Sequence, residues 1–169
     1  MKQQISDELT QAVGEAAARL RKIDEGTAAF RVQPGKWSVK EIIGHLIDSA
    51  TNNHQRFIRA QQTHEFAFPG YAQDEWVRSQ GYQDRSWLEL IDLWALYNRH
   101  LSHVIQRVPE SALGAKCRIG TGEPVTLAFL IEVLSAPSAS PSGTDRGADI
   151  CVIMGRPGLN LKSSSELIR

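Results

Sequence analysis

The clearest chemical signal in this sequence is His45, which stands in the segment Gly44-His45-Leu46 inside an otherwise apolar run. Imidazole can bind a transition metal or transfer a proton near neutral pH. At helical spacing, one stripe beside the apolar face carries His45, Ser49, Asn52 and Arg56. The residues alone leave two interpretations open: a boundary histidine hydrogen-bonded to a neighbour, which is the simpler one, and a metal ligand.

The other histidines are weaker candidates. His54 falls near the inner face of the same predicted helix, where a buried, hydrogen-bonded histidine is expected. His100 and His103 are three residues apart, an acceptable spacing for ligands, but they point away from the apolar seam and are interpreted as surface histidines.

Acidic and thiol groups offer no obvious catalytic arrangement. Asp48 and Glu41 are expected to be solvated charges on a helix face. Cys117 has no histidine or other base nearby in the sequence, which argues against a catalytic thiol.

The element that must position His45 is a helix predicted from Val39 to about Gln61. Ser38 and Glu41 form an S-x-x-E capping box at its start, and Trp37 and Ile42 occupy the positions of a hydrophobic staple. A preceding helix is expected to end near Gly26, because apolar residues recur every three or four positions before it. These residues are Ile5, Leu9, Val13, Ala16, Ala17, Leu20 and Ile23.

Two further helices follow a long loop. Residues 63–85 form this loop, and Asp74 to Gln80 is expected to carry a helical turn of its own. The third helix opens with a second capping box, at Ser86 and Glu89, and stops at Pro109. After a connector, Thr126 is expected to cap the fourth helix.

The fourth helix is interrupted early. Pro137 and Pro141 stand where it should continue, and the segment from Ser135 to Arg169 lacks a sustained period of either kind. We therefore expect a helical domain over 1–134 and an irregular or disordered tail over 135–169.

The overall composition indicates a soluble domain. Of 169 residues, 41% are hydrophobic and 22% charged, and the net charge is +0, so the balance predicts neither a nucleic-acid surface nor a membrane span. Two distant cysteines and no apolar leader favour free thiols in the cytoplasm.

Four segments in this order resemble the DinB-like superfamily of damage-inducible proteins. They are KWSVKEIIGHLIDSATNNHQRF, FPGYAQDEWV, LWALYNRHLSHVIQRVP and EPVTLAFLIE. The resemblance spans roughly residues 5–133. It implies an all-α, up-down four-helix bundle, here with the fourth helix truncated.

The resemblance also implies a divalent metal (Ni, Zn or Fe) held by three histidines. One ligand would be His45, and the other two would come from an H-x-x-x-H or H-x-x-H-H pattern late in the fourth helix. No histidine follows His103 in this sequence. The triad is therefore incomplete, and metal binding is expected to be weak or absent.

A frame change in the gene would explain the lost histidines and the lost helical period together. With suitable codons for Ser135 to Gly147, a one-base shift encodes a histidine-rich segment. Because several codons encode most of these residues, the sequence is compatible with a frame change but does not prove one. The alternative is a natural tail that is built differently from that of the family.

Three functions remain open. The family includes thiol-dependent transferases, so the chain would belong to a metal-dependent transferase or hydrolase lineage, with a small-molecule or thiol substrate facing Ser49, Asn52 and Arg56. Alternatively, it is a non-catalytic bundle for stress response or assembly, or a defective copy without activity. A shortened fourth helix is further expected to uncover the seam of Trp94, Leu101 and Ile105, which predicts a marginally stable or self-associating protein such as a homodimer.

Overall fold

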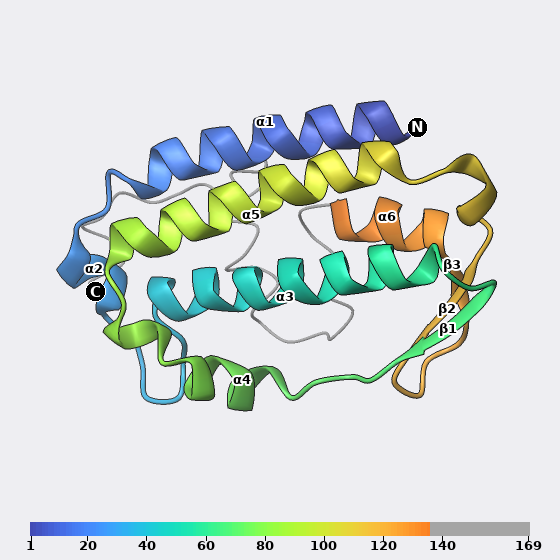
Figure 1. Cartoon of the computed structure of the whole chain (residues 1–169). Helices are drawn as coiled ribbons and strands as arrows, with labels where there is room; N and C mark the ends of the chain where they lie inside the picture. Colours follow the sequence, from blue (N-terminus) through green and yellow to red (C-terminus); the bar gives the residue numbers. More distant parts are fainter. Residues whose placement is uncertain (136–169) are drawn as a thin grey trace.

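Four helices form the body of the molecule in the computed structural model, which describes residues 1–135. They are α1 (Lys2–Leu20), α3 (Val39–Ala60), α5 (Trp87–Arg107) and α6 (Leu127–Ser135). Helix α5 packs against both α1 and α3, and α6 contacts α1 and α3 (Figure 1). The predicted four-helix bundle is confirmed, with α6 described for nine residues.

Helix α3 begins where the sequence predicts. The Ser38 side chain accepts a hydrogen bond from Glu41 N at 3.3 Å, and Glu41 Oε2 accepts one from Ser38 N at 2.9 Å. Glu41 also pairs with Arg31, whose Nε lies 2.8 Å from Oε2. Glu41 is therefore buried in a capping network, and the expectation of a solvated charge was wrong.

The first predicted helix is divided in two. Helix α1 ends at Leu20, and a short helix, α2 (Glu25–Ala29), follows it. Asp24 caps α2 by accepting a hydrogen bond from Thr27 N at 2.9 Å. Gly26 lies within α2, so the expected stop at this glycine was wrong.

A long connection between α3 and α5 sets their relative direction. It contains strand β1 (Glu65–Phe68), helix α4 (Gln73–Gln80) and the 3-10 turn η1 (Tyr82–Asp84). Helix α4 confirms the helical turn predicted in this loop. The connection runs back along the length of α3, so α3 and α5 point the same way (Figure 1).

A small sheet lies at one end of the bundle, where the sequence suggested no strands. Strand β1 pairs in parallel with β2 (Lys116–Ile119), and β2 pairs antiparallel with β3 (Val125–Thr126). The turn η2 (Glu110–Ala112) precedes β2. The buried Cys117 faces its partner Phe66 in the register of β1 and β2. The strands are short, which explains why they leave no clear period-2 pattern in the sequence.

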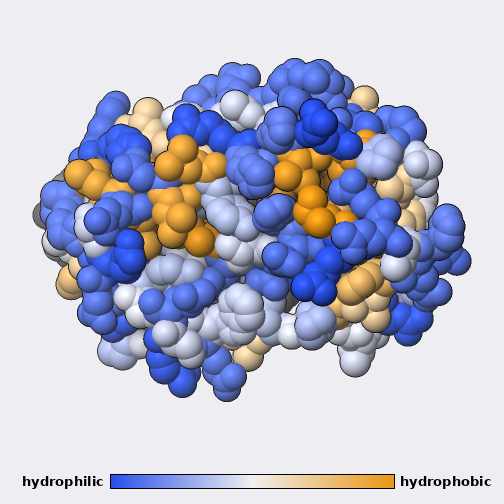
Figure 2. All heavy atoms as spheres, viewed as in Figure 1, coloured by the Kyte–Doolittle hydropathy of each residue, from blue (hydrophilic) through white to orange (hydrophobic). Residues whose placement is uncertain are grey.

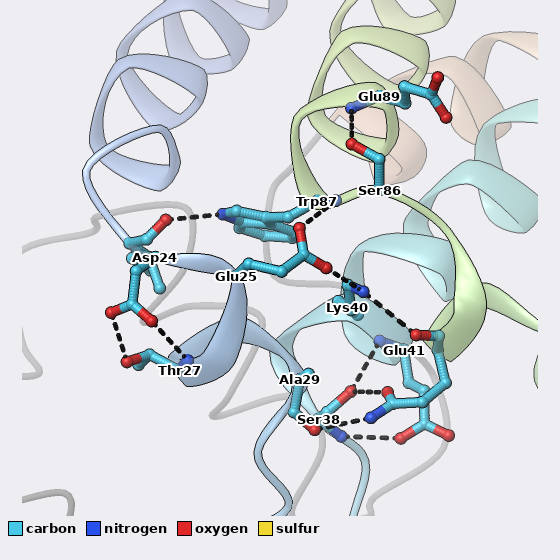
Figure 3. A network of polar contacts seen from close by, with 12 residues as sticks. Asp24, Glu25, Thr27, Ala29, Ser38, Lys40, Glu41, Ser86, Trp87 and Glu89 are labelled. Carbon is cyan, nitrogen blue, oxygen red and sulfur yellow. Dashed lines mark hydrogen bonds and ion pairs between the residues drawn. The ribbon is translucent and has the colours of Figure 1, made fainter.

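The start of α5 is tied to two other helices by polar contacts (Figure 3). The Ser86 side chain caps α5 by accepting from Glu89 N, and Glu25 of α2 accepts a hydrogen bond from Trp87 N at 2.9 Å. Glu25 also pairs with Lys40 of α3, a lysine that is itself buried. Helices α2, α3 and α5 are thus joined at one end of the bundle.

The seam of α5 is covered in this structure. Trp94, Leu101 and Ile105 are 2%, 4% and 1% exposed, so the expectation that a short fourth helix would leave them in water was wrong. Helix α1 runs along α5 and, together with α3, supplies the covering surface.

The start of α6 follows the prediction. Thr126 Oγ1 accepts a hydrogen bond from Phe129 N at 3.1 Å. The proline-containing segment and the proposed short strand at 149–154 lie outside the described residues. Within residues 1–135, no helix is both long and apolar enough to cross a membrane.

Candidate functional site

His45 lies two turns into α3 and is buried, with 5% of its surface exposed. Its ring centroid is 5.2 Å from that of Trp37, the residue before the helix cap. His45 therefore faces the interior of the protein, rather than the boundary that its sequence position suggested.

The neighbouring Gly44 makes room for a tyrosine ring. A Cβ atom at Gly44 would lie 2.0 Å from Cδ2 of Tyr82, far inside any real contact. The ring of Tyr82 consequently packs directly on the α3 backbone. From there its hydroxyl donates a hydrogen bond of 2.6 Å to Asp48 Oδ1.

Asp48 is the most deeply buried acid beside this site, at 1% exposed. Oδ1 also accepts a hydrogen bond from Gln80 Nε2 at 3.1 Å, whereas Oδ2 has no hydrogen-bond partner among residues 1–135. Burial raises the pKa of Asp48, and the hydrogen bonds from Tyr82 and Gln80 oppose that rise. The prediction of a solvated Asp48 was wrong, because Tyr82 and Gln80 from the α3–α5 connection pack on this face of α3.

Two of the predicted stripe residues reach a groove beside α3. Asn52 and Arg56 line a cavity of about 320 Å³, with Phe66, Phe68 and Pro69 on its other side. Ser49 does not line this cavity. It is half-buried, and its hydroxyl lies 3.4 Å from Asn53 Nδ2.

Arg56 is a charged side chain that is buried in the protein. It is 8% exposed, and Nη1 donates a hydrogen bond of 2.8 Å to Asn53 Oδ1. No carboxylate in the described part of the chain pairs with it. Burial accordingly lowers the pKa of Arg56. The guanidinium therefore pays a desolvation cost that a bound anion would offset.

Tyr71 interacts electrostatically with both Asp48 and Arg56. Burial raises its pKa, the charge of Asp48 adds to the rise, and the charge of Arg56 reduces it. Sequence reasoning did not identify Tyr71 or the phenylalanines of β1 as parts of the site. The signal available was the density of aromatic residues in the loop, but their positions depend on the chain returning along α3.

The described residues supply one ligand, His45, of the three-histidine metal centre that the family resemblance implies. Across residues 1–135, no group of three or more His, Cys, Asp or Glu side chains could hold a metal ion. His45 is present, and the positions expected for the other two ligands lie outside the described residues. The described residues therefore support no chemical step through a metal at His45.

The remaining histidines and the cysteine are placed largely as expected. His54 is half-buried, with Nδ1 2.8 Å from the Tyr97 hydroxyl, while His100 and His103 are exposed. Burial, together with the nearby His100, lowers the pKa of His54. Cys117 is buried and burial raises its pKa, which disfavours the reactive thiolate.

Comparison with known proteins identifies the lineage of this fold. YfiT from Bacillus subtilis, described as a probable metal-dependent hydrolase with an unusual four-helix bundle topology, superposes with a TM-score of 0.62. The two proteins are 17% identical, and the match covers 77% of each chain. A comparison with curated protein sequences gave no match. The DinB superfamily model matches residues 8–136, which establishes that the chain belongs to the DinB superfamily.

Proposed function

We propose that this chain binds an anionic small molecule in the groove beside α3 and derives from a metal-dependent transferase or hydrolase lineage. Arg56 would bind the anionic group, Asn52 would contribute hydrogen bonds, and Ser49 would act only indirectly, through Asn53. The observation that carries the proposal is the buried Arg56 guanidinium, which has no acidic partner in the described residues and lines a cavity.

The position of the groove supports a link to the site implied by the family. Asn52 and Arg56 lie two and three turns beyond His45 on the same stripe of α3. A ligand held by Arg56 could extend along this stripe, with the aromatic wall of β1 covering its apolar part. A thiol that carries carboxylates has the required combination of an anionic end and a compact body.

The direct test is calorimetric titration of the full chain with glutathione and, separately, with inorganic phosphate, each in the presence of EDTA. Loss of a charge-assisted hydrogen bond is worth about 1.5–3 kcal/mol. We therefore expect saturable binding of at least one of these ligands, weakened about 10- to 100-fold by Arg56→Gln. Arg99→Gln, which removes an exposed arginine of α5, is the matched control and should bind as the wild type does.

Two results would refute the anion site. One is the absence of binding of either ligand to the wild type, and the other is unchanged binding by a folded Arg56→Gln variant. Arg59→Gln offers a second variant on an exposed residue at the same groove, should Arg56→Gln fail to fold. Its binding should be reduced less than that of Arg56→Gln, because Arg59 is more solvated.

A non-catalytic role in assembly is the second candidate, and one surface feature favours it. Leu88, Leu93 and Leu96 of α5 are 54%, 43% and 59% exposed. Figure 2 shows that apolar residues gather in patches on one face of the molecule. A homodimer through this side of α5 would cover the three leucines. Sedimentation equilibrium of the wild type and of Leu88→Gln/Leu96→Gln would distinguish a dimer from a monomer.

A further inference from the structure

Helices α3 and α5 bring together histidines that the α3 groove does not use. His54 comes from α3, and His100 and His103 come from α5. The rings of His54 and His100 meet edge to face, with centroids 5.0 Å apart and an interplanar angle of 89°. His100 is exposed, so ions in solvent can reach this pair.

The separation of these two rings is compatible with imidazoles that share a metal ion. A metal–nitrogen distance of about 2.1 Å and a tetrahedral angle at the metal place the centres of two coordinated imidazoles about 5 Å apart. His103 does not share this arrangement. Its ring is 6.4 Å from that of His100 and nearly parallel to it, with an interplanar angle of 27°.

Tyr97 orients His54 for this role. The Tyr97 hydroxyl lies 2.8 Å from His54 Nδ1. Histidines that bind metals commonly engage their second ring nitrogen in a hydrogen bond of this kind, which sets the tautomer and the ring orientation. When Nδ1–H donates to the tyrosine oxygen, the lone pair of Nε2 is available for a metal.

We propose that His54 and His100 form a two-histidine site for a late first-row divalent ion, oriented by Tyr97. Imidazole ligands suit Cu(II), Ni(II) and Zn(II), and Cu(II) is expected to bind tightest of the three. Water would complete the coordination. Two protein ligands make a weak, exchangeable site.

This site is distinct from one built on His45 and goes beyond the proposed anion binding. His54 follows His45 by nine residues, which on a helix is about 13 Å along the axis and half a turn around it. His54 therefore points to the opposite side of α3 from His45 and from Arg56. The two proposals can fail independently of each other.

The test is titration of the metal-free full chain with Cu(II), using glycine as a weak competing chelator. We expect one equivalent to bind, with electron paramagnetic resonance couplings from two nitrogen ligands. His54→Gln and His100→Gln should each weaken binding at least tenfold. Tyr97→Phe should weaken it about tenfold, as loss of an outer hydrogen-bond partner commonly does.

His103→Gln and His45→Gln are the matched controls and should bind Cu(II) as the wild type does. Wild-type affinity in the folded His54→Gln and His100→Gln variants would overturn the proposal. Loss of Cu(II) binding in His45→Gln alone would overturn it as well, because the ion would then lie on the other side of α3. Where a glutamine variant fails to fold, diethyl pyrocarbonate provides a second test: bound Cu(II) should protect His54 and His100 from modification but not His103.

Discussion

At the residue scale, the most distinctive feature of this protein is that ionisable side chains of α3 are buried in its interior. Asp48 and Arg56 are both buried and both lie on α3, yet neither has an oppositely charged partner among residues 1–135. Asp48 is stabilised by Tyr82 and Gln80 on one oxygen only. Such groups are costly for folding, and a protein retains them most readily where they bind something.

The raised pKa of Asp48 predicts a specific dependence of stability on pH. Between its unfolded value, near 3.8, and its higher folded value, the native state holds a proton that the unfolded chain has lost. The stability of the wild type relative to Asp48→Asn should therefore fall as pH rises through this window and then level off. Urea denaturation of both proteins across this range measures the difference.

Glu41 provides a control for which the pH dependence of stability should have the opposite sign. The hydrogen bond from Arg31 lowers the pKa of Glu41 below 4.5, with further contributions from Ser38. Its contribution to stability is present above that value and is lost as pH falls through the folded pKa. The stability of the wild type relative to Glu41→Gln should thus rise with pH. If the stability of the wild type relative to each variant changed with pH in the same direction for both, the opposite pKa shifts of Asp48 and Glu41 would be contradicted.

At the element scale, the close contact between α3 and the α3–α5 connection depends on the absence of a side chain at Gly44. An alanine there would have to displace the Tyr82 ring, and with it the hydrogen bond to Asp48. We expect Gly44→Ala to destabilise the protein by about 1–3 kcal/mol, because overpacking outweighs the better helix propensity of alanine.

Gly14 on α1 is the matched control for this substitution. A Cβ atom at Gly14 would meet nothing within 4 Å, so Gly14→Ala should be neutral or stabilise the protein by up to about 1 kcal/mol. Thermal or chemical denaturation of both variants measures the comparison. Equal effects at the two glycines would show that Tyr82 can move away without cost.

At the scale of the whole molecule, the buried apolar side chains of residues 1–135 form one continuous core. The fully buried side chains of this core come from several elements and include Trp87, Trp94, Phe57, Leu127 and Ile131. We propose that this unit folds independently of residues 136–169. A chain ending at Ser135 should unfold cooperatively, with a midpoint within about 4 °C of the full chain, a shift that corresponds to roughly 1 kcal/mol.

Circular dichroism melting of the two chains provides the measurement. A truncated chain that lacks a cooperative transition would show that the remaining residues pack on the bundle. The genomic sequence around the codons for Glu132 to Gly147 addresses the proposed frame change separately. A one-base shift that restores a histidine-bearing helix would support it, and the absence of such a frame would reject it.

The sequence by itself determined the four bundle helices and the starts of α3, α5 and α6, because these starts depend on contacts between residues close in the chain. The capping box of Ser38 and Glu41, the cap at Thr126 and the periodic apolar faces are local in this sense, and the structure confirms them. Hydrogen-bond geometry within one turn is enough to specify each of these features.

Only the tertiary structure decided what the stripe on α3 faces. The chain returns along α3 and brings Tyr71, Gln80 and Tyr82 to a surface that appeared solvated in the sequence. It also sets α3 and α5 parallel and places β1 against a strand that lies about fifty residues later. The burial of Asp48 and Arg56 and the meeting of His54 with His100 depend on side chains from distant segments, and no periodicity within a single helix encodes such contacts.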